Sequence, residues 1–282
     1  MTRNTPAQTR GTTWFMKLAG ASREVLRGTP TVLVKDAQLG NELVRYLAVT
    51  RDPDNPSPRA RNGELGIGEA ITIASRVSET VNLDKDRTKR PIIALVDAPS
   101  QVYGTCEEEN GIFLTFAAAV EAYVAARMSG HPIIALVVGG AFSGAFLAHG
   151  YQAHCILSID APGVSVHAMG QESAARVMKM SRHDFDEICR KSLPMSYDLR
   201  DYTRLGMLHR LLTGIEADSP DSSDVDAVKS ALIDAICVAR SRGPYLSYRL
   251  NSESAHLARS ASLRVIEMLN RQWDEARKRL NG

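Results

Sequence analysis

The chain has 282 residues, of which 44% are hydrophobic and 23% charged, and its 34 Lys and Arg nearly balance its 32 Asp and Glu. This composition is that of an ordinary soluble globular protein, and the near-neutral balance argues against nucleic acid as a partner. No run approaches the roughly 18 apolar residues of a membrane span, and the N-terminal stretch lacks the apolar segment of a secretion signal. Four widely spaced cysteines form no metal-ligand pattern. We therefore expect a cytoplasmic protein with reduced thiols, no membrane association and no bound metal.

The first third of the chain predicts strands followed by a helix. Thr31–Val34 and Glu42–Thr50 are β-rich and are separated by the turn signal Gly40-Asn41, which predicts a hairpin or neighbouring strands. A loop dense in Pro, Asn and Asp follows. Glu64–Val81 then carries apolar residues at helical spacing, so we expect a helix there.

The middle of the chain predicts a parallel β-α-β unit. Ile92–Val96 is a continuous β-branched run of the kind found in strands buried on both faces. An Ala-rich helix is expected from about Gly111 to Gly130. Ile133–Val138 repeats the strand pattern and is expected to stop at Gly139-Gly140. Such a crossover is right-handed and joins parallel strands in nearly all folds.

The rest of the chain is predicted to be mostly helical after two short strands. A helix over Ser143–His149 precedes strands at Cys155–Ile159 and Val164–Val166. Ser223 is the expected N-cap of a later helix that ends before Gly243. A last helix from Ser262 aligns apolar residues on one stripe, namely Leu263, Ile266, Leu269, Trp273, Ala276 and Leu280. Such an amphipathic helix must cover a core or a partner. We expect one α/β domain over residues 1–282, with a helical C-terminal region from about residue 205.

The ends of the two central strands are the expected site of chemistry. Asp97–Gly104 and Gly139–Ala145 are turns that precede predicted helices. In open α/β sheets ligands bind at the carboxyl ends of strands, where helix N-termini offer free N–H donors. Glycines at these turns would let a ligand oxygen approach the main chain, although they could equally serve only to make tight turns.

Several blocks of sequence resemble one enzyme family. PIIALVDAPSQVYG from Pro91, GHPIIALVVGGAFSGAFLAHGYQA from Gly130 and VSVHAMG from Val164 resemble the carboxyltransferase branch of the crotonase superfamily. AFLAHGYQA together with VHAMG is closely similar to the gamma subunit of biotin-independent malonate decarboxylase, as are RARNGE near residue 60 and PMSYDLRDYTRLGML near residue 200. Ser100 departs from the wider pattern, in which Gly usually follows the Pro.

The resemblance implies a crotonase-like spiral of ββα units and a heteromeric lyase. A beta-type subunit and an acyl-carrier subunit would be its partners, and the isolated chain could form homo-oligomers. A malonyl thioester on the carrier would lose CO2 to leave an acetyl thioester. This chain itself would bind no cofactor, because the CoA-derived prosthetic thiol would sit on the carrier.

Main-chain amides at the two turns are expected to stabilise the enolate that forms when CO2 leaves. The residues that we expect in catalysis are Gly104, Thr105, Ala141, Phe142, Ser143, Gly144 and His167. Those that we expect to contact substrate are Ser100, Tyr103, Gly140, His149 and Tyr151. The enolate must also take a proton, for which Tyr103, His149, Tyr151 and His167 are candidates; the setting of His167 after a strand favours it. Which turn binds the acyl oxygen and which the leaving carboxylate stays open.

Three other readings remain. Clp-type serine peptidases share the expected fold, but a GxSxG elbow around Ser143 would need Gly at residues 141 and 145, and both are Ala. A biotin-dependent carboxyltransferase would have similar turns. Met178-Lys179-Met180 matches the letters of a biotinylation site, yet we expect it in a helix, whereas a biotinylated Lys needs a hairpin tip. A scaffold subunit without chemistry is the third reading.

Overall fold

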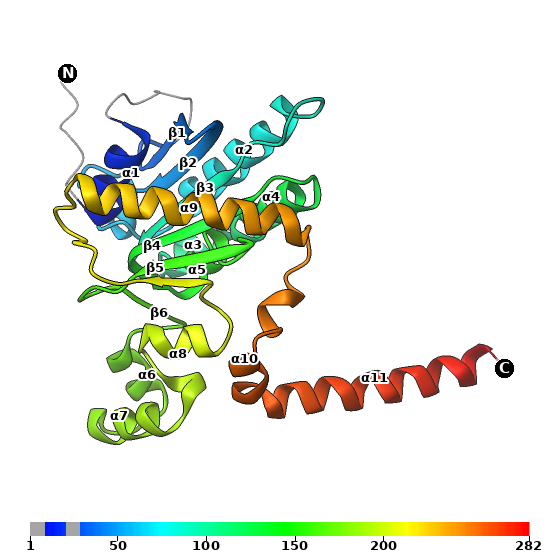
Figure 1. Ribbon diagram of the computed structural model, residues 1–282. Coiled ribbons are helices and arrows are strands. Elements are labelled where there is room, and N and C mark those ends of the chain that lie inside the picture. Colours follow the sequence, from blue (N-terminus) through cyan, green and yellow to red (C-terminus); the bar gives the residue numbers. More distant parts are fainter. Residues whose placement is uncertain (1–8, 21–28, 282) are drawn as a thin grey trace.

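The structure is a computed structural model that describes residues 9–20 and 29–281 (Figure 1). Residues 1–8, 21–28 and 282 lie outside the described ranges. The expectation that the N-terminal stretch is no secretion signal therefore falls partly on residues that are not described. Among the helices of the described ranges, none is both long and apolar enough to cross a membrane.

A seven-stranded sheet forms the centre of the molecule (Figure 1). Its strands are β1 (Val32–Leu39), β2 (Glu42–Val49), β3 (Ile92–Ala98), β4 (Ile133–Phe142), β5 (Cys155–Ile159), β6 (Ser165–His167) and β7 (Arg210–Leu212). The order is β1-β2-β3-β4-β5-β7, with β6 paired to the end of β4. β1 and β2 form an antiparallel hairpin, one of the two arrangements expected for them, and the other pairings are parallel. The predicted parallel β-α-β unit is confirmed.

Strand β4 extends beyond the predicted stop at Gly139-Gly140, so that expectation was wrong. Its last residues are paired on both sides: Ala141 lies opposite Ala98 of β3 and opposite Val166 of β6. This pairing with segments distant in the sequence keeps Gly139 and Gly140 extended. On their own, two consecutive glycines would favour a turn. The strand passes into a helix only after Phe142.

Helices cover both faces of the sheet. On one face α2 (Ile67–Leu83), α4 (Ile112–Met128), α5 (Ser143–Ala148) and α8 (Leu199–Arg204) contribute to one apolar core. On the other face α1 (Arg10–Ala19) and α9 (Ser222–Arg242) enclose a second core, and α9 runs across the sheet in Figure 1. The N-cap of α9 is Asp221 and not Ser223 as predicted, because the Asp221 carboxylate accepts a hydrogen bond from the Asp224 amide at 2.9 Å.

The remaining helices lie beyond the sheet. They are α3 (Thr105–Glu109), α6 (Gln171–Val177), α7 (Arg182–Lys191), α10 (Glu253–Ala258) and α11 (Ser260–Asn281), with three short 3₁₀ turns at Pro58–Ala60, Leu193–Met195 and Ser247–Leu250. Met178-Lys179-Met180 was wrongly expected in a helix: it forms the turn between α6 and α7, where Lys179 has a φ of 53°. That turn joins two helices, so it is still no β-hairpin tip.

Candidate active site

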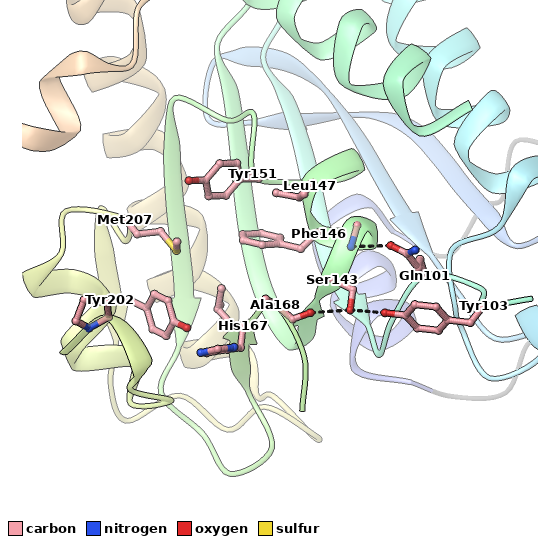
Figure 2. Close-up of a pocket in the computed structure, with 13 residues that line it drawn as sticks. Gln101, Tyr103, Ser143, Phe146, Leu147, Tyr151, His167, Ala168, Tyr202 and Met207 are labelled. Atoms are coloured by element: carbon pink, nitrogen blue, oxygen red, sulfur yellow. Dashed lines mark hydrogen bonds between the residues drawn. The ribbon is translucent and has the colours of Figure 1, made fainter. Parts of the chain in front are cut away.

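The central feature of the site is the sharp turn from β4 into α5. Ser143 stands at this turn with a φ of 56°, in the left-handed region that most side chains avoid. The following Gly144 N–H donates a hydrogen bond to Oε1 of Gln101, at 3.0 Å, as Figure 2 shows. A Cβ on residue 144 would lie 2.2 Å from that oxygen. Glycine at residue 144 therefore leaves room for an oxygen at this place, and with a Cβ there the Gln101 side chain would have to move.

The turn after β3 lies against the turn after β4, as predicted. The Tyr103 hydroxyl donates to Oγ of Ser143 at 2.9 Å, and the Ser143 hydroxyl donates to the Ala168 carbonyl at 2.8 Å (Figure 2). The main chain of the β3 turn is fixed by Leu65, whose amide donates to the Ser100 carbonyl at 3.0 Å and whose carbonyl accepts from the Val102 amide at 2.9 Å. These bonds hold the backbone while the Gln101 side chain reaches across to α5.

A cavity of about 540 Å³ opens in front of these groups. Its lining is Gln101, Tyr103, Ser143, Gly144, Phe146, Leu147, Tyr151, Val166, His167, Ala168, Pro194, Tyr202 and Met207. No Asp or Glu belongs to this lining among the residues that the structure describes. Few polar groups therefore converge in a mainly apolar space, which is the usual composition of a site for a small molecule.

His167 is the imidazole that lines the cavity. Its ring stacks on that of Tyr197 with the centroids 4.0 Å apart, and burial lowers the pKa of His167 below its ordinary value. The buried Nδ1 atom has no hydrogen-bond partner within the described part of the chain. His167 is consequently neutral at pH 7 and is positioned by stacking, with a polar atom left for a further partner.

Five of the predicted site residues line the cavity together, and seven do not. Those in the lining are Tyr103, Ser143, Gly144, Tyr151 and His167. Outside it are Ser100, Gly104, Thr105, Gly140, Ala141, Phe142 and His149. Gly140, Ala141 and Phe142 belong to the paired end of β4, whereas they were expected in a turn. Gly104 is the N-cap of α3 and Thr105 is its first residue. The Ser100 hydroxyl donates a hydrogen bond to the Gln101 carbonyl at 2.7 Å.

His149, expected to contact substrate, lies in the core behind the cavity. Its Nε2 contacts the Leu95 carbonyl at 3.1 Å and must donate there, so Nδ1 accepts from the Tyr123 hydroxyl at 2.9 Å. Burial lowers the pKa of His149 to about 4. Both ring nitrogens are thus used internally, which is the arrangement of a structural histidine.

Sequence reasoning missed several lining residues, of which Gln101 is the most informative. Gln101 lies inside the turn Asp97–Gly104, but within that turn only Ser100, Tyr103 and Gly104 were predicted to have roles. Tyr202 and Met207 come from segments whose approach to β4 only the fold reveals. Both lie in the block PMSYDLRDYTRLGML that resembles the gamma subunit, but that resemblance did not assign them to the site.

Residues 60–273 match the family model of the malonate decarboxylase gamma subunit, which is most of the chain. This chain belongs to the malonate decarboxylase gamma subunit family. The predicted resemblance is thereby confirmed, and the family is one of subunits of a decarboxylase.

Known proteins extend this family assignment. A malonyl-S-ACP:biotin-protein carboxyltransferase of Malonomonas rubra is 30% identical over 216 residues, 75% of this chain and 70% of its own length. A chain of a Pseudomonas malonate decarboxylase hetero-tetramer is 41% identical over 94% of this chain and all of its own. It superposes with a TM-score of 0.88 in a complex with coenzyme A and 0.86 in a complex with malonate.

The fold class has independent support. Transcarboxylase 12S, solved as a hexamer, shares 20% identity and a TM-score of 0.61, covering 84% of this chain and 41% of its own. At this identity the similarity shows a shared fold and nothing about function. Together with the Pseudomonas structures it confirms the predicted crotonase-like α/β fold.

Proposed function

We propose that this chain acts with a beta-type subunit to decarboxylate a malonyl thioester carried by an acyl-carrier subunit. Cleavage of the carbon–carbon bond releases CO2, and its electron pair passes into the enolate of an acetyl thioester, which then takes one proton. Family membership and the likeness to a hetero-tetramer solved with malonate support the reaction. The observation on this chain that carries the proposal is the Gly144 amide, which is directed at an acceptor oxygen at the edge of an apolar cavity.

The Gly144 N–H is the donor that would hold the thioester oxygen. Charge builds on that oxygen in the transition state, and one such preorganised donor contributes ~3 kcal/mol in other enzymes. The Gln101 carboxamide oxygen already stands at 3.0 Å from this amide, in the place that a thioester oxygen would take. Substrate binding would therefore displace Gln101, exchanging one carbonyl acceptor for another.

His167 is the proton donor that we favour. It is the imidazole within the cavity lining, and although burial lowers its pKa and keeps it neutral at pH 7, an anionic malonyl group beside it would favour the protonated form that gives up the proton. The Tyr103 hydroxyl is the other candidate in the lining, but it is engaged with Ser143 at 2.9 Å. The prosthetic thiol that carries the acyl group would be a CoA-derived arm on the carrier subunit, so this chain needs no cofactor of its own.

A biotin-dependent carboxyltransferase is the second candidate function, because the Malonomonas rubra relative transfers to a biotin protein. The test is CO2 release from malonyl-carrier by the reconstituted complex, with and without avidin. Avidin-insensitive release is expected for the decarboxylase. Loss of release in avidin would favour the second candidate instead.

A serine hydrolase would have to use Ser143. The left-handed turn at Ser143 resembles a nucleophile position, yet its hydroxyl donates to the Ala168 carbonyl and no imidazole of the described residues hydrogen-bonds it. Ser143→Ala should therefore retain most of the decarboxylase activity, since only the main chain at residues 143–144 is needed. A loss of four orders of magnitude would point to a nucleophile.

A further inference from the structure

Helix α11 presents a narrow apolar seam to solvent. Figure 1 shows it extending away from the sheet and its covering helices. Its seam consists of Ile266, Leu269, Trp273, Ala276 and Leu280, which recur at alternating spacings of three and four. The Trp273 side chain is 68% exposed and that of Leu280 is 85% exposed. The seam therefore has no cover within the described chain.

The spacing specifies what kind of surface would cover the seam. A 3-4 repeat is the a/d pattern of helices that pack side by side with interlocking side chains, and it gives a narrower stripe than a helix lying on a sheet needs. We propose that α11 is a docking arm that packs against a helical groove of the beta-type subunit. This inference rests on the proposed function, because it takes its partner from that assembly.

The charges beside the seam argue against a second copy of this chain as the occupant. The positions that flank an a/d seam are occupied here by Leu263 and Val265, which widen the apolar stripe at the start of the helix, and then by Asn270, Gln272, Arg277 and Arg279. None is acidic, and the carboxylates of Glu267, Asp274 and Glu275 lie on positions turned away from the seam. Two copies would therefore leave Arg277 and Arg279 without a flanking carboxylate, whereas flanking charges normally pair across such seams. The occupant should carry acidic residues beside its apolar groove.

The first part of α11 lies within the residues that match the family, whereas the residues after 273 do not. The match to the gamma subunit family runs to residue 273 and so includes the first two turns of the seam. The similar Pseudomonas chain comes from a hetero-tetramer and aligns over 94% of this chain. A partner subunit of such an assembly is thus the fitting occupant.

Adjacent residues on α11 provide matched variants. Leu269 lies in the seam, whereas Met268 is turned about 100° around the helix from it and lies outside the seam, and both are about half exposed. Because neither is buried, replacement by Glu should leave the folded chain intact, which circular dichroism and melting of each variant verify. Affinity for the purified beta-type subunit is then measured with the full chain by titration calorimetry.

Leu269→Glu is expected to weaken binding of the beta-type subunit about 30-fold or more, as for the central residue of an interface, while Met268→Glu changes it less than threefold. Arg277→Glu should weaken binding as well, and added salt should lower the affinity of the unmodified chain. Equal affinities for Leu269→Glu and Met268→Glu would overturn the proposal. So would sedimentation showing that Leu269→Glu only converts a dimer of this chain into monomers.

Activity separates this inference from the proposed function. At saturating beta-type subunit, Leu269→Glu should release CO2 at the rate of the unmodified complex, because α11 carries none of the cavity residues. If full activity is reached without any change in affinity, the docking arm is wrong and the function stands. If even the unmodified complex releases no CO2, the proposed function is wrong.

Discussion

Replacing Gln101 by Ala tests how the donor amide is occupied before substrate binds. In the structure the Gln101 oxygen accepts from the Gly144 N–H at 3.0 Å, and both groups are neutral. A hydrogen bond of this kind contributes about 0.5–1.5 kcal/mol net. If substrate must displace it, its removal should lower the KM for malonyl-carrier by roughly two- to tenfold, because each 1.4 kcal/mol is a factor of ten. The turnover number should stay within about twofold.

The assay is steady-state CO2 release by the reconstituted complex over a range of malonyl-carrier concentrations. Gln101→Glu is the matched variant with the opposite sign. Its carboxylate would hold the amide more strongly than the carboxamide does and would repel the malonyl carboxylate, so the KM should rise. A turnover number that falls about 100-fold in Gln101→Ala at unchanged KM would refute the reasoning, since the carboxamide itself would then be a catalytic donor.

The remaining predictions concern stability. Burial lowers the pKa of both His149 and His154 to about 4, below the ordinary 6.5 that each regains on unfolding. Unfolding then takes up protons between these values, so the free energy of unfolding should fall by up to about 1.4 kcal/mol per pH unit for each histidine as pH drops from 6.5 to 4. Urea titrations at several pH values measure this, and no decline below pH 6.5 would contradict it. Gly206→Ala should cost about 2–4 kcal/mol, because φ is 75° and the new Cβ would lie 2.1 Å from the Arg249 carbonyl oxygen. Gly214→Ala, at φ 72° in open space, should cost only about 1 kcal/mol when both variants are measured by urea titration, and equal costs would refute the steric argument.

Local patterns predicted the strands of the sheet well, because burial on both faces demands continuous apolar runs. Ile92–Val96 and Ile133–Val138 lie within β3 and β4, and Cys155–Ile159 is β5. The end of β4 could not be predicted, since the residues that keep it extended belong to β6, about 25 positions further along the chain. Two residues could cap α9, and Asp221 does so instead of Ser223. The Asp221 carboxylate accepts from the Asp224 amide, and the Asp224 carboxylate accepts from the Asp221 amide.

The sequence predicted that two turns would converge, and the structure brings them together through Tyr103 and Ser143. It did not predict which groups at those turns face the cavity. Gln101 is recognised as a site residue only because its side chain reaches the Gly144 amide. His149 is recognised as structural only because Tyr123 and Leu95 use both of its ring nitrogens. Such assignments depend on side-chain direction, about which the spacing of residues says little.

The Gly144 amide is the group on which the proposed decarboxylation most depends, and single-turnover CO2 release with Gly144→Ala tests its role directly. The added Cβ would occupy the space of the bound oxygen, 2.2 Å from its present acceptor. Loss of a donor contribution of ~3 kcal/mol predicts a decarboxylation rate roughly 150-fold lower, while Ser143→Ala keeps most of the rate. A Gly144→Ala complex that assembles normally and releases CO2 at the unmodified rate would contradict the account.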